Sequence, residues 1–369
     1  MIYLDYAATF PPFPEVIATY AQIASDVFGN PAAIHSAGSR ARSVLHSSRK
    51  RLAGLLNVRP EELYFTSGAT ESNNWAVTMG CRHPGRRHIV CAASEHKSVL
   101  EAVSAMARQG YQVTYLQPDR QGRICAADAA AAVRQDTALL CVQAVNNETG
   151  VIQDVKALAA AAHSKGALYF CDSVQSFGHV NQPLHLADLI SLSAHKFGGP
   201  RGIGCLIVRQ PTRLQPLLSG GGQEFGLRSG TENLPAIAGF SLAADIASAA
   251  LPRESLRLQD LTQQLLDGLR QICPGVKIAA EQADRSPGIL CCAFPGKTGE
   301  EMVTRLDLKG ICASPGAACS SRDHTPSHVL LSMGYTPAEA AEFLRFSLGA
   351  LTTPEDIQKT VQVIADILS

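Results

Sequence analysis

Short apolar runs alternate with segments of helical periodicity through the first two thirds of this 369-residue chain. Helical spacing, with apolar positions three and four apart, covers 97–109, 125–135 and 154–165. Before, between and after these segments lie runs with the length of buried strands, at 63–66, 88–91, 112–116, 138–142, 167–171, 188–196 and 204–208. This alternation predicts an α/β fold with a mostly parallel, seven-stranded sheet.

The pattern changes near residue 250. Helical periodicity covers 234–249 and 253–272, and Leu251-Pro252 predicts a break between the two because proline disrupts a helix interior. The remainder predicts a smaller α+β domain, with a strand near 288–294 and helices near 299–309, 326–333, 337–342 and from Pro354. We therefore expect a large domain at 13–250 and a small domain formed by 1–12 and 251–369.

Composition narrows the class of protein. The chain carries 32 basic and 32 acidic residues, so no net charge favours nucleic acid or an anionic membrane as a partner. No apolar run reaches the roughly 20 residues that span a bilayer, and the strand-like start leaves no room for a signal peptide. Its 11 cysteines show neither CxxC pairs nor zinc-like spacing, so we expect no metal site. These features predict a cytoplasmic enzyme.

Lys196 ends one of the apolar runs. The segment Leu189-Ile190-Ser191-Leu192-Ser193-Ala194-His195-Lys196 is followed at once by Phe197-Gly198-Gly199-Pro200. An amine beside a buried sheet edge shifts readily to its neutral form, which the Schiff-base chemistry of pyridoxal phosphate requires. A lone lysine in this position would more often be a solvated side chain at a strand end, and other parts of the chain decide against that reading here.

Asp172 ends a second apolar run, Ala167-Leu168-Tyr169-Phe170-Cys171. Open α/β sheets bind ligands outside the carboxyl ends of their strands, so this carboxylate would face such a crevice. Pyridoxal chemistry needs an anion there to keep the pyridine nitrogen protonated. The alternative is a helix N-cap, with Gln175 completing a capping box.

A phosphate site is predicted where the strand at 63–66 meets Ser67-Gly68-Ala69-Thr70. The turn leads into a helix, whose first amides, the Thr70 hydroxyl and the positive end of the helix dipole suit a phosphate. A serine- and threonine-rich helix start without a ligand would have the same sequence.

Cys319 lies in a run of small, polar and turn-forming residues, about 312–326, that precedes a predicted helix. Such a loop is expected to be exposed. A thiol near Arg322 and His324 would form the thiolate more readily than a buried one. The remaining cysteines fall in apolar or unremarkable settings and are assigned to packing.

Together these motifs resemble the cysteine desulfurases of the class-V aminotransferase family, which have the fold-type I architecture of pyridoxal-phosphate enzymes. The resemblance runs nearly end to end. It is carried by Tyr3-Leu4-Asp5-Tyr6-Ala7-Ala8-Thr9, Phe65-Thr66-Ser67-Gly68-Ala69-Thr70-Glu71-Ser72, Glu95-His96-Lys97, Val145-Asn146-Asn147-Glu148-Thr149-Gly150, Asp172-Ser173-Val174-Gln175, Ala194-His195-Lys196, Gly220-Gly221-Gly222-Gln223-Glu224, Cys319-Ser320-Ser321 and Arg345-Phe346-Ser347-Leu348-Gly349.

The resemblance implies roles for matching residues. Lys196, Cys319 and His96 would be catalytic, with Lys196 holding the cofactor covalently and Cys319 accepting sulfur. Asn147 and Arg345 would bind the substrate, Arg345 through the carboxylate. Contacts with pyridoxal 5'-phosphate would come from Ala69, Thr70, His96, Asn147, Asp172, Gln175, Ser193, Ala194, His195 and Lys196, and from Thr231 of the partner subunit in a homodimer.

The implied reaction removes sulfur from L-cysteine, releases L-alanine and leaves a persulfide on Cys319 for a sulfur-acceptor or scaffold protein. The sulfur would serve iron–sulfur cluster assembly or thiolation of tRNA or a cofactor, and Cys319 would be the residue to contact a nascent cluster. The alternative is a selenocysteine lyase or another class-V aminotransferase or lyase, which needs the pyridoxal site but not Cys319.

Overall fold

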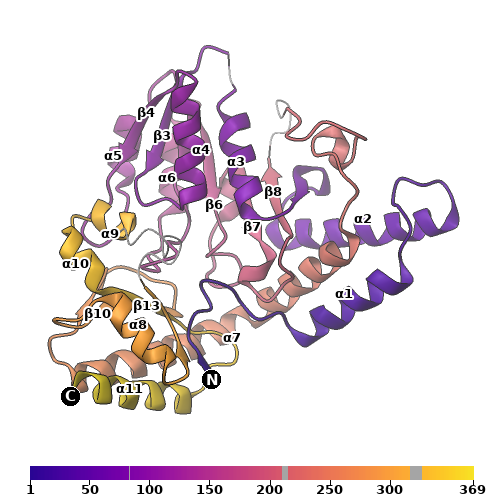
Figure 1. Ribbon diagram of the computed structural model, residues 1–369. Coiled ribbons are helices and arrows are strands. Elements are labelled where there is room, and N and C mark those ends of the chain that lie inside the picture. The colour runs from indigo at the N-terminus through magenta and orange to yellow at the C-terminus, as the bar shows by residue number, and fades with distance from the viewer. Residues whose placement is uncertain (83, 210–214, 316–325) are drawn as a thin grey trace.

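A computed structural model describes residues 1–82, 84–209, 215–315 and 326–369. Within these ranges a seven-stranded sheet has the order β2-β8-β7-β6-β5-β3-β4 (Figure 1). β8 runs antiparallel to β2 and β7, and the other neighbouring strands are parallel. The predicted mostly parallel sheet is therefore confirmed. Its strands are β2 (Leu63–Thr66), β3 (His88–Ala92), β4 (Gln112–Leu116), β5 (Thr137–Cys141), β6 (Leu168–Asp172), β7 (Leu189–Ser193) and β8 (Gly204–Val208).

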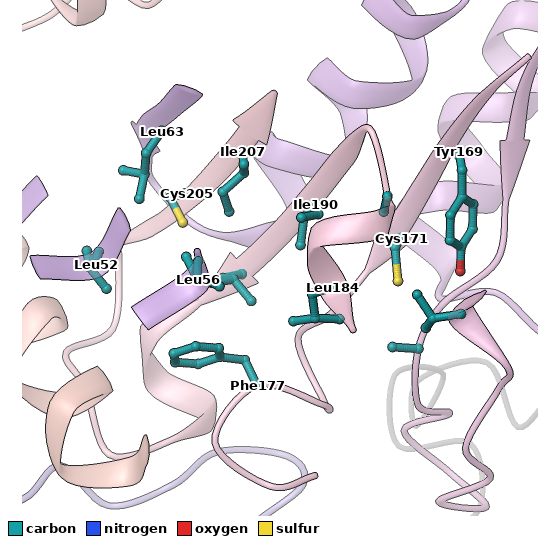
Figure 2. Packing of buried hydrophobic residues seen from close by; sticks show 14 of the residues in the cluster. Leu52, Leu56, Leu63, Tyr169, Cys171, Phe177, Leu184, Ile190, Cys205 and Ile207 are labelled. Carbon is teal, nitrogen blue, oxygen red and sulfur yellow. The ribbon is translucent and has the colours of Figure 1, made fainter. Parts of the chain in front are cut away.

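Helices cover both faces of this sheet, which explains why its strands are apolar without alternation. On β3, Val90 packs in the same cluster as Leu158 of α6, whereas Ile89 and Cys91 pack with Val99 of α4. Figure 2 shows part of the first cluster, with Leu52 and Leu56 of α2 beside the strands. The helices are α1 (Pro14–Asp26), α2 (Ser36–Leu56), α3 (Ala69–Gly80), α4 (Lys97–Arg108), α5 (Ala126–Ala132) and α6 (Val155–His163), with 3₁₀ turns η1 (Pro60–Glu62), η2 (Leu184–Leu186), η3 (Ala194–Lys196) and η5 (Glu224–Gly226).

The predicted helix break at Leu251-Pro252 is wrong. Pro252 lies inside one continuous helix, α7 (Leu234–Ile272). A proline in a helix interior costs about 3 kcal/mol. Burial on both sides offsets that cost. Residues such as Ala243 and Ala244 pack in the core of the large sheet, and Leu261 and Leu265 pack against the smaller one.

By length and composition, α7 could cross a membrane, and 56% of its most apolar window is buried inside the fold. It runs between two hydrophobic clusters, one around the large sheet and one around the small sheet. The expected division near residue 250 stays a prediction.

A second sheet has the order β12-β13-β10-β9 and lies at the end of the molecule where both termini are found (Figure 1). Its central strand β13 (Phe343–Ser347) was not predicted, although the helices around it were. The elements here are β9 (Lys277–Ile278), β10 (Ile289–Ala293), β12 (Ser314–Pro315), α8 (Gly299–Asp307), α9 (His328–Ser332), α10 (Pro337–Glu342) and α11 (Pro354–Leu368).

The N-terminal segment joins the two sheets. Strand β1 (Ile2–Tyr3) pairs in parallel with β11 (Ile311–Cys312). The Tyr6 amide then donates to the Ser347 carbonyl on β13, at 3.2 Å, and the Phe10 amide donates to the His195 carbonyl, at 2.8 Å. Residues 4–10 therefore run from the small sheet to the turn that carries Lys196.

Candidate active site

Lys196 and Asp172 share one edge of the large sheet because β6 and β7 are parallel neighbours. Asp172 is the last residue of β6, and Lys196 ends the 3₁₀ turn that follows β7. Both side chains line a cavity of about 600 Å³. The structure therefore brings these two predicted site residues together at the carboxyl ends of neighbouring strands.

Lys196 is held by the backbone of the N-terminal segment. Its Nζ donates to the carbonyl oxygens of Ala7 and Ala8, at 2.7 and 2.9 Å. Gln175 Nε2 donates to the same Ala7 oxygen, at 2.8 Å, and also lines the cavity. Two polar side chains from different strand ends are thus fixed by one turn of backbone.

Asp172 is buried and receives two hydrogen bonds. The Val174 amide donates to Oδ1 at 3.0 Å, and Asn73 Nδ2 donates to Oδ2 at 2.8 Å. Asn73 is fully buried and donates a second time, to Ser98 Oγ, at 2.8 Å. The sequence analysis did not identify Asn73, although its position one helical turn after Thr70 places it on the cavity side of α3. These two donors fix the orientation of the Asp172 carboxylate.

The turn before α3 forms a cradle with the turn after β7. Gly68, Ala69 and Thr70 line the cavity, as do Ser193 and His195. Gly68 has φ +154°, which side chains disfavour, and no side chain caps the helix here. The first helical amides therefore remain available for an anion. Burial, then Lys196 and Arg201, lower the pKa of His195 to about 4, so this ring is neutral at pH 7.

Glu71 and Arg228 form an ion pair that the sequence analysis did not predict. The Glu71 side chain lines the cavity and accepts hydrogen bonds from the Ser67 amide, at 2.9 Å, and from Arg228 Nε, at 2.8 Å. These bonds lower the pKa of Glu71 against the opposing effect of burial. Arg228 thus compensates the negative charge of Glu71, which lines the same cavity as the predicted phosphate site.

His96 lines the cavity at the start of α4, where it caps the helix. Its Nδ1 contacts Ser98 Oγ at 2.8 Å and accepts from the Ser98 amide at 3.2 Å. The preceding residue, Glu95, is buried, and burial followed by the charge of Asp172 raises the pKa of Glu95 well above its ordinary range. Burial and the neighbouring Asp172 therefore both favour the neutral form of Glu95.

Arg345 brings a cation to the same cavity. It is 2% exposed on β13, and its Nη1 donates to the Asn147 carbonyl at 2.7 Å. Its Nη2 pairs with Asp5 Oδ1, also at 2.7 Å. Among the described residues, Nε of Arg345 has no hydrogen-bond partner, so this buried donor is available to an acceptor in the cavity. Asn147 lines the cavity beside it.

Ten of the predicted side chains line this cavity, namely Ala69, Thr70, His96, Asn147, Asp172, Gln175, Ser193, His195, Lys196 and Arg345. Ala194 does not; it is fully buried and its amide donates to the Ile203 carbonyl. Thr231 is exposed and does not line it either. Cys319 lies outside the described residues. Within the described ranges, no cluster of three histidine, cysteine or acidic side chains could hold a metal ion.

Comparison with known proteins identifies the family of the chain. Residues 2–360 match the model of the class-V aminotransferases. The chain belongs to this family. It is 35% identical to a protein named cysteine desulfurase IscS from Clostridium botulinum, over all of this chain and 94% of that protein.

Solved structures give the same picture. A NifS-like protein covers all of this chain, which in turn covers 99% of it, at 32% identity and a TM-score of 0.93. A structure described as SspA in complex with cysteine has 32% identity and a TM-score of 0.83, over 94% of this chain and 99% of that one. These relatives confirm the resemblance to cysteine desulfurases and the fold-type I architecture, and the family is pyridoxal-phosphate-dependent.

Proposed function

We propose that this protein is a pyridoxal-phosphate-dependent cysteine desulfurase. The observation that carries the proposal is one cavity that presents Lys196, Asp172 and Arg345 together. An amine, a buried carboxylate and a buried guanidinium are the groups that an amino acid and a pyridoxal ring require. The family match and the cysteine desulfurase names of its relatives support the same reaction.

The residues around the cavity fit the cofactor. Asp172 lines the cavity and would hold the pyridinium nitrogen, and the hydrogen bond from Asn73 Nδ2 fixes the orientation of its carboxylate. The amides at the start of α3 would hold the phosphate, joined by polar groups of Ser193 and His195 and by Thr231 of the partner subunit in a homodimer. Ala194 would contribute only its backbone, because its side chain is buried. The bound cofactor would supply the electron sink for chemistry at the substrate α- and β-carbons.

The chain's own side chains would bind and orient the substrate and move its protons. Arg345 would bind the carboxylate of L-cysteine, and Asn147 would contact the substrate next to it. Lys196 would attach the cofactor and, once displaced, move a proton at the substrate α-carbon. His96 would stack near the cofactor and exchange protons with the leaving sulfur. Each role uses a group that already lines the cavity.

In the overall reaction, the carbon–sulfur bond of L-cysteine breaks and a sulfur–sulfur bond forms on the Cys319 thiol. L-Alanine leaves, and the persulfide carries the transferred sulfur to an acceptor or scaffold protein. We place the enzyme in the cytoplasm, since all ten cysteines in the described residues are free thiols. Iron–sulfur cluster assembly or thiolation of tRNA or a cofactor would consume the sulfur.

The deciding experiment combines product analysis with mass spectrometry. Protein loaded with pyridoxal phosphate is exposed briefly to L-cysteine, and both alanine and the mass of each cysteine-containing peptide are measured. We expect alanine and one added sulfur on Cys319. Lys196→Ala should abolish both, and Cys319→Ala should abolish the adduct and alanine formation. Cys125→Ala, which removes an exposed thiol, serves as the matched control.

Sulfide release at full rate by Cys319→Ala would contradict the proposal and favour a lyase, including one specific for selenocysteine. Absence of pyridoxal phosphate binding, measured by visible absorbance of the purified protein, would contradict any class-V activity.

A further inference from the structure

Glu148 is a buried carboxyl that the proposed reaction does not use. It is 5% exposed and lies immediately after Asn147. Its Oε2 accepts a hydrogen bond from Ser327 Oγ, a residue 179 positions away. Ser327 is also the N-cap of α9, where its Oγ accepts from the Leu330 amide at 3.2 Å. One hydroxyl thus joins α9 to the loop that carries Asn147.

The backbone around Glu148 is fixed from the other side as well. Asn146 Oδ1 accepts from the amides of Glu148 and Thr149, both at 2.9 Å. Asn146 Nδ2 donates to the Ser94 carbonyl at 3.1 Å, two residues before His96. The Glu148 carboxyl therefore has a defined place relative to the Asn147 carbonyl, which accepts from Arg345.

Charged or titratable groups from three packed elements interact electrostatically with Glu148. They are Arg345 on β13, His96 and Lys97 at the start of α4, and Cys291 on β10, while α9 contributes the neutral Ser327. Burial raises the pKa of Glu148 to about 7, and the Ser327 bond, Arg345, His96 and Lys97 all act in the opposite direction. The charge of Glu148 therefore changes near neutral pH.

We infer that Glu148 is a positioning residue that controls how strongly Arg345 binds the substrate carboxylate, and that Ser327 of α9 adjusts this control. The inference rests on the proposed role of Arg345 as the carboxylate site. Arg345 already pairs with Asp5. Glu148 interacts electrostatically with Arg345 and follows Asn147, whose carbonyl accepts from Arg345. An ionised Glu148 therefore weakens the attraction of Arg345 for an incoming anion, whereas a neutral Glu148 does not.

The test measures L-alanine, the product, as a carboxylate ligand without a thiol that titrates. Its affinity for the enzyme loaded with pyridoxal phosphate is measured by calorimetry between pH 6 and 8.5. For the wild type, we expect the Kd to rise about tenfold as pH increases through 7, because Glu148 ionises. Glu148→Gln should abolish this rise and keep the tight binding of low pH, since glutamine preserves shape and an acceptor for Ser327.

Ser327→Ala gives an independent prediction. Loss of a donor that favours the ionised form raises the pKa of Glu148, so the midpoint of the Kd profile should move to higher pH. Glu62→Gln is the matched control, because Glu62 is buried in an ion pair with Arg59 away from the cavity, and its profile should equal the wild type.

The inference would be overturned if the Kd of Glu148→Gln for L-alanine rose with pH as much as that of the wild type. An unchanged midpoint of the Kd profile in Ser327→Ala would also overturn it. Either result would leave cysteine desulfuration intact. Failure of the wild type to bind L-alanine at any pH would instead contradict the proposed function together with the inference.

Discussion

Arg345 and Asp5 form a buried ion pair across 340 residues of sequence, with Nη2 2.7 Å from Oδ1. The side chain of Arg345 is 3% exposed and that of Asp5 is 19% exposed. Two and three residues after Asp5, the carbonyls of Ala7 and Ala8 accept from Lys196. The N-terminal segment therefore fixes both the proposed carboxylate site and the proposed cofactor site.

Asp5→Ala should lower the free energy of unfolding by about 2 kcal/mol. The substitution leaves a buried guanidinium without its charged partner, and the remaining exposure of Asp5 reduces the cost below that of a fully buried pair. Asp5→Asn should cost less because it keeps an oxygen acceptor. Urea unfolding of the protein without cofactor measures both. Asp26→Ala, at an exposed helix end, is the control, and a cost no greater than this control would contradict the importance of the pair.

Asn73→Ala should weaken pyridoxal phosphate binding by about tenfold or more. It removes one of the two donors that hold the Asp172 carboxylate, and a hydrogen bond to a charged group contributes about 1.5–3 kcal/mol. Titration of the cofactor-free protein, followed by visible absorbance, gives the affinity. The neighbouring Asn74→Ala, whose side chain donates only to the Thr70 carbonyl, should change it little. Equal affinities of the two variants for pyridoxal phosphate would show that the hydrogen bond from Asn73 to Asp172 does not contribute to cofactor binding.

The parts of the site that lie at strand ends were predictable from local pattern. Lys196 and Asp172 follow apolar runs, and parallel pairing of β6 with β7 brings such ends together. Arg345 was identified through the family motif, but its strand and its partner Asp5 were not predicted. Their contact depends on pairing between segments at opposite ends of the chain, which no local periodicity reveals.

Helix α7 illustrates the opposite failure. Proline disfavours a helix interior, so Pro252 predicted a break. Burial of the two halves of α7 against two different cores outweighs the cost of this proline. The places of Asn73 and Glu95 were not predicted for a related reason. Asn73 follows one motif and Glu95 belongs to another, but only the packing of α3 and α4 around Asp172 shows that their polar groups are buried near that carboxylate.

Glu224→Gln should destabilise the fold by about 3 kcal/mol. Glu224 pairs with Arg49 at 2.6 Å, with side-chain exposures of 2% and 5%, and its Oε2 also accepts from the Phe65 amide at 2.8 Å. Its backbone has φ 48°, which these bonds must hold in place. The neutral amide leaves Arg49 buried without a counter-charge.

Thermal or urea unfolding measures this cost. The control is Arg51→Ala, which removes the exposed pair of Arg51 with Asp245 and should cost less than about 1 kcal/mol. A Glu224→Gln variant as stable as this control would mean that the Arg49 charge is compensated elsewhere.

The buried Glu148 also predicts how stability depends on pH. Its pKa rises from an ordinary value of 4.5 to about 7 on folding, so its contribution to stability is fully present below about pH 4.5 and is lost as pH rises through about 7. At about 1.4 kcal/mol per pH unit, the loss from this site is about 3 kcal/mol.

Glu148→Gln does not titrate and keeps its hydrogen-bond acceptor for Ser327. Between pH 5 and 8, the wild type should therefore lose about 3 kcal/mol more unfolding free energy than this variant, measured by urea unfolding without cofactor. Glu62→Gln should follow the wild type, and an equal loss in wild type and Glu148→Gln would mean that Glu148 is already ionised at pH 5.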